Sequence, residues 1–310
     1  MKILYTDQFV LPLPPGHRFP MAKYSLLRER VEAAGLSGGE PLCVPHAASD
    51  EEILRAHDPA YLRRVQSGEL TEAEIRRIGF PWTSQMVERS RRSAGATIEA
   101  CRAAIEQGVA VSLAGGTHHA FRAQGAGYCV FNDSAIAALA MQAEGRARRV
   151  VIVDCDVHQG DGTAAILAAD PSVYTFSIHA GNNFPVRKQA SDLDIELPDR
   201  AGDEQYLAAL EKGLCRALSA GQPDLAIFLA GADPFEGDRL GRLSLSKPGL
   251  AARDSMVLGL CRDAGVAVAV TMAGGYGRNI EDTVDIHFST VRAAAQFHRD
   301  QGSRTAPAPA

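Results

Sequence analysis

The chain has 310 residues, 46% of them hydrophobic, and a formal net charge of −5 at pH 7. These values allow a large buried core, and without a linker-like segment they predict one domain over residues 1–301, followed by a disordered tail at 302–310. The acidic balance argues against nucleic acid as a partner. No basic leader precedes an apolar stretch, and no apolar run is long enough to span a membrane, so we expect a soluble, cytoplasmic protein with no membrane partner.

Predicted strands occur as short runs rich in β-branched residues. After a first strand near the start of the chain, each run ends in a glycine or polar cluster, and helical patterns at 134–145 and 204–221 lie between the runs. Alternating strands and helices predict βαβ units and a parallel sheet covered on both faces. The runs are VAVSLAGGTHH (109–119), RRVVIVDCDVHQGDG (148–162), SVYTFSIHAG (172–181), DLAIFLAGADP (224–234) and VAVAVTMAGGYG (266–277).

The cysteines give no sign of a disulfide framework. Six are scattered along the chain, and none forms a CxxC pair. In a chain of this length the pattern predicts reduced, buried thiols and no cysteine-bound zinc.

Polar residues follow the predicted strands at their carboxyl ends. Open parallel sheets bind ligands beyond these ends, so residues that are distant in the sequence are expected to converge on one crevice. The candidates are His118, His119, Asp154, Asp156, His158, Asp233 and Tyr276.

A metal site is predicted where the run at 148–162 ends. In an extended segment Asp154, Asp156 and His158 would project to one side, and a carboxylate and an imidazole two residues apart can bind one cation. Asp233 would supply the third ligand, as in catalytic zinc sites that keep a further position open. The alternative is that Asp154 and Asp156 cap the following helix or accept bonds from loop amides.

His118 and His119 are candidates for acid–base catalysis. They follow a glycine turn, and imidazole is suited to proton transfer near neutral pH. Asp154 and Asp161 could each accept a hydrogen bond from one of them, fixing its tautomer and raising its basicity. A single histidine in such a place is more often a core or surface residue, but two adjacent ones are less usual.

Tyr276 follows the last predicted strand in AGGYG. The glycines would let the backbone turn and direct the phenol into the crevice, where it could donate to a developing oxyanion. A tyrosine packed into a turn explains the same sequence equally well.

Together these segments resemble the histone deacetylase family. The resemblance rests on GGTHHA, GAGYCVFND, DCDVHQGDG, FSIH, GADPFEGDRLGRLSLS and AGGYG, in this order, and it covers nearly the whole chain. VDCDVHQGDG with EGDRLGRLSLS is most similar to the class IV branch and its bacterial relatives. The resemblance implies the arginase/deacetylase fold, an α/β domain whose parallel sheet has eight strands, and a zinc-dependent hydrolase that removes acyl groups from amines.

The resemblance also implies the role of each site residue. Zinc, or Fe²⁺ in its place, would be bound by Asp156, His158 and Asp233. His118 and His119 would be the tandem histidines backed by Asp154 and Asp161, and Tyr276 would stabilise the transition state. From the chemistry of these pairs we expect His119, held by Asp161, to be the general base and His118 to act electrostatically. Residues lining the acyl-lysine tunnel would be Gly127, Tyr128 and Phe184. A structural K⁺ would be bound by Asp154, Asp156, His158, Ser177 and Ile178.

Two other functions stay open at this point. A ureohydrolase of the arginase type would use two manganese ions, but its DxDxxDP pattern is absent from GADPFEGD. A non-enzymatic acyl-lysine binder would lack a ligand or the tyrosine. The acylated amine could be an acyl-lysine, a polyamine or a small metabolite, because the loop IGFPWTSQ lacks the acidic residue with which class I relatives hold the substrate backbone. The acyl-chain length and oligomeric state are not determined by the sequence.

Overall fold

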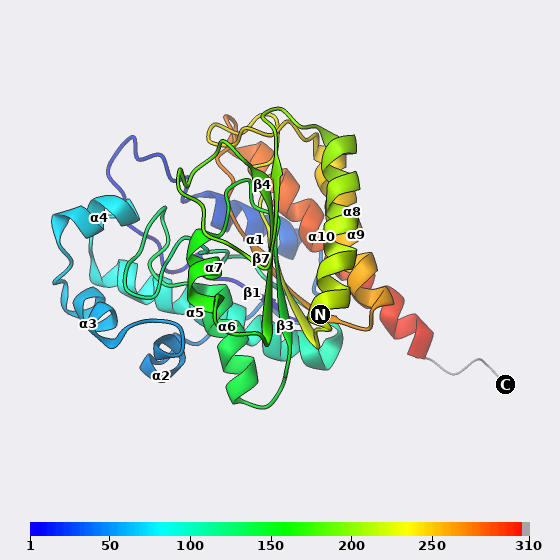
Figure 1. Ribbon diagram of the computed structural model, residues 1–310, viewed down its shortest axis with the longest axis horizontal. Helices are drawn as coiled ribbons and strands as arrows, with labels where there is room; N and C mark the ends of the chain where they lie inside the picture. Colours follow the sequence, from blue (N-terminus) through cyan, green and yellow to red (C-terminus); the bar gives the residue numbers. More distant parts are fainter. Residues whose placement is uncertain (306–310) are drawn as a thin grey trace.

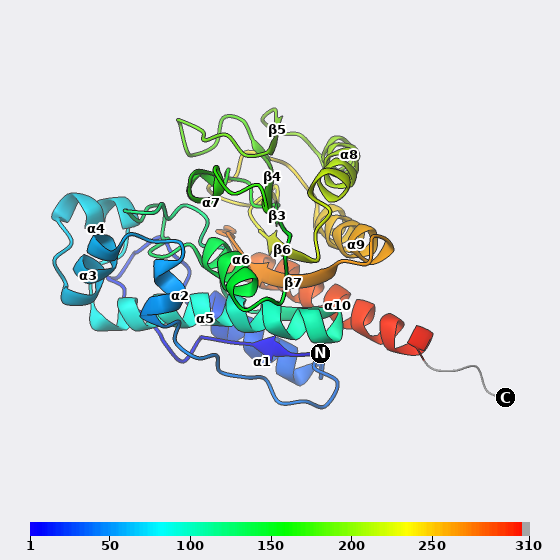
Figure 2. The ribbon, with the colours of Figure 1, turned by 60° about the horizontal axis from the view of Figure 1, so that its bottom comes forward.

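A computed structural model describes residues 1–305, in which seven strands form one parallel sheet in the order β1-β2-β7-β6-β3-β4-β5. Figure 2 shows β5, β4, β3, β6 and β7 side by side. The strands are β1 (Ile3–Leu4), β2 (Val109–Ser112), β3 (Val150–Asp154), β4 (Val173–Ala180), β5 (Leu193–Leu197), β6 (Leu225–Ala230) and β7 (Ala267–Met272).

The expected count of eight strands is wrong by one. Beyond β1 the sheet continues only as a single bridge between Leu4 and Cys43. Cys43 exchanges two backbone hydrogen bonds, with Ile3 and Tyr5. Pro41 and Pro45 stand two residues to either side of Cys43. Because proline has no N–H to give to a ladder, this segment cannot extend into a full strand.

The five central strands form where the apolar runs predict them. Every residue of β2, β3 and β6 is buried, as expected of strands covered on both faces. The sequence analysis missed β5, whose LDIEL is only half-buried and lies at the sheet edge. Its alternating charged residues do not give the continuous apolar run of a central strand.

Helices cover both faces of the sheet (Figure 1). On one face lie α1, α8, α9 and α10, and on the other lie α5, α6 and α7, with α2 to α4 further out beyond α5. The helices are α1 (Lys23–Ala33), α2 (Asp50–Leu54), α3 (Pro59–Ser67), α4 (Glu72–Ile78), α5 (Ser84–Gln107), α6 (Asp133–Ala143), α7 (Asp161–Leu167), α8 (Asp203–Gly221), α9 (Lys247–Asp263) and α10 (Ile280–Thr305).

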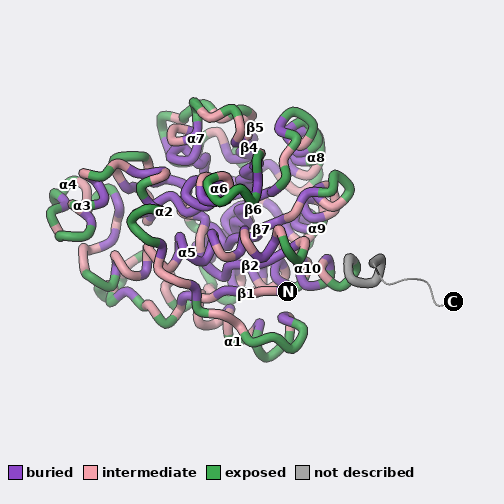
Figure 3. Tube along the Cα trace, turned by 90° about the horizontal axis from the view of Figure 1, so that it is seen from below, coloured by how far each residue is buried: buried purple, intermediate pink, exposed green. Residues whose placement is uncertain are grey.

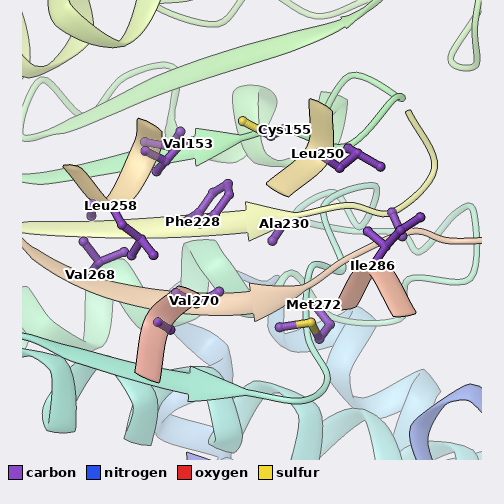
Figure 4. Close-up of a cluster of buried hydrophobic side chains, with 14 of the residues drawn as sticks. Val153, Cys155, Phe228, Ala230, Leu250, Leu258, Val268, Val270, Met272 and Ile286 are labelled. Atoms are coloured by element: carbon purple, nitrogen blue, oxygen red, sulfur yellow. The ribbon is translucent and has the colours of Figure 1, made fainter. Parts of the chain in front are cut away.

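Two hydrophobic cores result, one on each face of the sheet. Figure 4 shows part of the first, where Val153, Phe228 and Val270 from three neighbouring strands meet Leu258 of α9 and Ile286 of α10. Buried chain is concentrated in the strands and the inner sides of the helices, whereas exposed chain follows the outer turns (Figure 3). The sheet is therefore a rigid support for the loops at its carboxyl edge.

Three details differ from or lie beyond the sequence expectations. The glycine at the end of the helical pattern 204–221 does not end the helix: α8 includes Gly221, and Gln222 takes the left-handed conformation at φ 44°. Two cysteines are not buried as expected: Cys43 is partly exposed and Cys215 is exposed, and all six thiols are free. The helix α10 continues to Thr305, into the segment expected to be a tail, and residues 306–310 lie outside the described part. Within that part, no helix is both long and apolar enough for a membrane span.

Candidate active site

The carboxyl ends of the strands surround one cavity of about 520 Å³. Loops after β2, β3, β6 and β7 bring His118, His119, Asp156, His158, Asp233, Gly274 and Tyr276 to its wall. Asp154 and Asp161 do not line the cavity and stand behind the histidines instead. The predicted convergence of residues that are distant in sequence is therefore what the fold produces.

Three of these residues form a compact group of metal-binding side chains. One ligand atom from each of Asp156, His158 and Asp233 lies within 4.8 Å of the others, and all three residues are buried. His158 Nδ1 lies 2.9 Å from Asp156 Oδ1 and 3.4 Å from Asp233 Oδ2. Burial lowers the pKa of His158, but the hydrogen bond to Asp156 and the closeness of both carboxylates outweigh that effect and raise the pKa to about 10.

The surroundings of the group fit a divalent cation. Asp233 Oδ2 is buried and has no hydrogen-bond partner among the described residues, although a buried carboxylate oxygen normally needs one. Burial, and then the charge of Asp156, raise the pKa of Asp233 to about 7. A cation would satisfy that oxygen, and two oxygens with one nitrogen are a donor set that zinc accepts.

The local backbone differs from the expected extended segment. The strand β3 ends at Asp154, and the chain then turns, with Asp154 Oδ1 accepting the Asp156 N–H and Asp156 Oδ1 accepting the His158 N–H. The side chains therefore meet because of a turn, not because they share one face of a strand. The capping alternative is wrong, since α7 begins after Gly160 without a side-chain cap, although both carboxylates do accept loop amides.

His118 is paired with Asp154. Its Nδ1 lies 2.7 Å from Asp154 Oδ2, and its Nε2 lies 3.8 Å from Asp156 Oδ1, with 3% of the residue exposed. Burial lowers the pKa of His118, but the charges of Asp154 and Asp156 outweigh it and raise the pKa to about 9. An imidazolium at this position balances buried carboxylate charge.

His119 is paired with Asp161 at the start of α7. Its Nδ1 lies 2.7 Å from Asp161 Oδ1. Burial, and then the charge of His118, lower the pKa of His119 to about 4, against the raising effect of Asp161. The two rings lie 4.1 Å apart between centroids, so the adjacent histidines have opposite charge preferences. His119 is neutral near pH 7, with Nδ1–H donating to Asp161 and Nε2 free to accept a proton.

Tyr276 is buried beside the metal-binding group. Burial, and then the charges of Asp233 and Asp156, raise its pKa well above the usual value for a phenol. The hydroxyl therefore keeps its proton and can act only as a neutral donor or acceptor. Its ring lies 6.0 Å from Tyr128 and 6.2 Å from Phe19 between centroids.

The residues assigned to the tunnel lie at the cavity wall. Gly127 has φ 53°, and a Cβ there would lie 2.7 Å from His119 Cδ2, so only glycine lets the chain pass this close to the ring. Tyr128 also has a left-handed backbone, at φ 66°, which is uncommon for a residue with a side chain. Phe184 is 47% exposed and stacks edge-on against His119 at 4.9 Å.

Of the residues assigned to a potassium site, Asp156 and His158 line the cavity, whereas Asp154 stands behind His118. Asp154, at the end of β3, is the register partner of Ser177 within β4, so their side chains are neighbours. The Ser177 hydroxyl lies 2.9 Å from His179 Nδ1. Burial raises the pKa of Asp154, which a cation would offset.

Sequence reasoning missed a residue that holds Tyr276 in place. This residue, Asp238, lies in the loop after β6. Its Oδ2 accepts the Tyr276 N–H at 2.6 Å, and its Oδ1 accepts the N–H groups of Leu240 and Gly241. No spacing pattern marks such a contact, because it joins two loops 38 residues apart.

A second missed residue supports the metal-binding group from behind. Arg253 of α9 is fully buried, and its Nη1 donates to Gly231 O at 2.5 Å and to Cys155 O at 3.4 Å. These carbonyls lie next to the turns that carry Asp156 and Asp233. The guanidinium therefore joins the ends of β3 and β6, and an arginine in a helix gives no sequence signal for this role.

Known proteins resemble this chain over most of its length. The family model described as "Histone deacetylase domain" matches residues 17–291. The chain is 44% identical over 296 residues to an uncharacterized protein of Picosynechococcus sp., covering 96% of this chain and 99% of that protein. It is 30% identical over 282 residues to a histone deacetylase-like amidohydrolase of Pseudomonas aeruginosa, covering 86% of this chain and 74% of that protein. The crystal structure of the HDA15 HD domain has the same fold, with a TM-score of 0.79, 24% identity and coverage of 97% and 94%.

Proposed function

Because this chain belongs to the histone deacetylase family, with the family domain spanning residues 17–291, we propose that it is a metal-dependent hydrolase that removes acetyl or longer acyl groups from lysine-like or other amines. The observation that carries this proposal is the buried group Asp156, His158 and Asp233 beside the neutral His119 in one cavity. Acid–base and electrophilic groups that face a common space are what amide hydrolysis requires.

We assign zinc to the group, with iron(II) as the alternative ion. When bound, the ion would supply Lewis acidity to the amide carbonyl and to the attacking water. Asp233 contributes an oxygen that makes no hydrogen bond among the described residues, and the Gly274 N–H fixes Asp156 through its Oδ2 at 2.7 Å. This hydrogen bond orients the carboxylate before any ion arrives.

His119 is the proposed general base. Asp161 holds its Nδ1–H, so Nε2 would take the proton from water and later deliver one to the leaving amine nitrogen. The lowered pKa of His119 keeps this nitrogen unprotonated near pH 7. His118 would remain an imidazolium and stabilise negative charge that develops in the transition state, because Asp154 and Asp156 raise its pKa against the effect of burial.

Tyr276 is the proposed hydrogen-bond donor to the oxyanion. Its raised pKa keeps the proton on the phenol, and Asp238 fixes the backbone from which the ring projects. Donors preorganised in a buried site cost little reorganisation during the reaction, and one such donor is worth about 10²–10³ in kcat.

A structural potassium ion is a further part of the proposal. Asp154 and the Ser177 hydroxyl, with the backbone of Asp156, His158 and Ile178, would bind it behind His118. The register pairing of Asp154 with Ser177 supports this arrangement. A cation here would let Asp154 stay ionised despite its burial.

A binuclear ureohydrolase is less well supported, because the neighbouring carboxylates are already engaged. Asp154 binds His118, Asp161 binds His119, and Asp238 accepts three backbone amides. Within residues 1–305, Asp156, His158 and Asp233 are the only cluster of three or more potential ligands. A non-enzymatic binder is disfavoured because all three ligands and Tyr276 are present.

The proposal is tested by measuring acyl release from acetyl-lysine and longer acyl-lysine peptides, and from acetylated polyamines, with and without a chelator. We expect turnover that the chelator abolishes and zinc restores, and about one divalent metal per chain. Two manganese ions per chain with activity on a guanidino compound would support the ureohydrolase instead. Asp156→Ala should lose both the metal and the activity.

A further inference from the structure

The cavity contains a positively charged inner part that the proposed reaction does not use. We define the cation chamber as Lys23, Tyr24, Arg89 and Ser93, all of which line the cavity. Lys23 is 3% exposed and Arg89 is 8% exposed. Both cations are therefore more than nine-tenths buried, where an unpaired charge is costly.

Neither cation has a carboxylate partner. Among the described residues, Arg89 makes no side-chain hydrogen bond or ion pair, and its buried Nη1 has no partner. Its one recorded contact is with the Tyr24 ring, 4.5 Å from the centroid. Lys23 Nζ lies 5.3 Å from the same centroid, and its hydrogen bonds are two contacts of 3.4 Å to the carbonyls of Ala273 and Gly275. Two like charges thus flank one ring without a counter-ion.

The charge of the whole cavity has the same sign. Among the described residues, the cavity wall includes five lysine and arginine side chains, and its only carboxylates are the proposed metal ligands. Of the three arginines outside the chamber, Arg76 and Arg242 are paired with carboxylates outside the wall. The chamber cations are not paired. A second anionic group is therefore what the cavity lacks.

The chamber lies next to the reacting centre. Lys23 bonds the carbonyls on either side of Gly274, and Gly274 donates its N–H to Asp156 Oδ2 at 2.7 Å. The ammonium also lies 5.4 Å from the ring centroid of Tyr276. Gly274 thus links the chamber to a metal ligand, and both lie on the wall of the same cavity.

From this geometry we propose that the enzyme removes acyl groups that end in a carboxylate, such as succinyl or glutaryl, with Arg89 and Lys23 binding that terminal carboxylate. The proposal rests on the deacylase function above. Water adds to the amide carbonyl, the C–N bond breaks, and the proton passes to the amine, so the products are a dicarboxylate and a free amine. A neutral acyl group, by contrast, brings no carboxylate to the chamber cations while it is still joined to the amine.

The test compares glutaryl-lysine with glutaramoyl-lysine, in which a primary amide replaces the terminal carboxylate at the same chain length. Malonyl- and succinyl-lysine with their amides extend the series. We expect kcat/KM to favour the acid over its amide by about tenfold or more, the value of one charged hydrogen bond. In Arg89→Gln the ratio should fall by about tenfold. Arg89→Lys, which keeps the charge, should restore part of it.

Arg92→Gln is the matched control, because Arg92 lies on the same helix but pairs with Glu88 outside the cavity. It should keep the wild-type ratio. Calorimetric titration of glutarate and of pentanoate into the metal-loaded protein gives a second measurement. Glutarate, with its second carboxylate, should bind more tightly than pentanoate in wild type but not in Arg89→Gln.

The outcomes separate this inference from the proposed function. Hydrolysis of neutral acyl-lysines with no preference for the acid over its amide would refute the carboxyacyl specificity and leave the deacylase function intact. A preference that survives in Arg89→Gln would equally refute the role of the chamber. Failure to hydrolyse any acyl-lysine would overturn the deacylase function, and with it the substrate class.

Discussion

Replacing Gly274 by alanine should disturb the metal-binding group although none of its three ligand residues is substituted. A Cβ at this position would lie 1.9 Å from Asp233 Oδ2 and 2.5 Å from Asp156 Oδ2, where no atom closer than 3.0 Å is tolerated. The backbone N–H that holds Asp156 is retained in alanine, so the effect is steric. The mutation therefore changes the positions of the two carboxylates while both ligands keep their chemical type.

The size of the effect follows from these distances. To clear the new methyl group, Asp233 Oδ2 must move by about 1 Å, whereas metal–ligand distances tolerate only about 0.2 Å. One ligand of three is then lost or badly placed. Since changes that merely reorient a ligand cost 10–100-fold in metal affinity, we expect a loss of about 10²-fold or more.

The assay is competition with a chromophoric zinc chelator, with circular dichroism and a thermal melt to check folding. Gly259→Ala is the matched control, because Gly259 lies in α9 and a Cβ there would meet nothing within 4 Å. It should leave metal affinity unchanged and stabilise the helix by about 0.5–1 kcal/mol. A folded Gly274→Ala protein with wild-type zinc affinity would show that the ion binds elsewhere.

Three further predictions concern proton transfer and positioning. Tyr276→Phe should keep metal content and folding while kcat falls by about 10² or more, and near-full activity would assign the oxyanion donor to another group. His119→Ala should lower kcat more than His118→Ala does, and a larger loss in His118→Ala would reverse the two roles. The acidic limb of the wild-type kcat/KM profile should lie near pH 4, not near 6.5, because the base is lost only when His119 is protonated as the pH falls through its lowered pKa. Asp238→Asn should lower kcat by about tenfold at unchanged metal content, since it weakens the bond to the Tyr276 amide; unchanged kcat would show that the loop positions Tyr276 without this carboxylate.

The central sheet and the converging site residues could be predicted from the sequence because strand ends in a parallel sheet share one edge. The runs ending at Asp154 and near Asp233 were sufficient to place the metal-binding group. The turn after Asp154 was not predictable, because alternation in a polar segment fits both a strand and a turn that bonds its own amides. The predicted eighth strand does not form, because Pro41 and Pro45 limit the edge segment around Cys43 to a single bridge. The resemblance to the family gave no information about these two prolines.

Contacts between side chains and distant backbone groups could not be predicted from the sequence. Asp238 and Arg253 act through backbone groups far away in the chain, and backbone partners leave no trace in residue type. Arg89 shows the same limit, since an arginine in a helix is normally solvated and only the packed structure reveals that this one is enclosed. The chemical type of each site residue could thus be predicted from the sequence, whereas the burial of its side chain could not.

The two edges of the sheet also bear on how copies of this chain behave at high concentration. Open strand edges can pair with another molecule and seed aggregates. At one edge β1 has two residues and is followed by a single bridge between prolines, and at the other β5 carries Asp194 and Glu196. Bringing two β5 strands together would oppose like charges, so sheet-to-sheet growth is discouraged at both ends, and the extended apolar strands stay in the interior where they cannot template association.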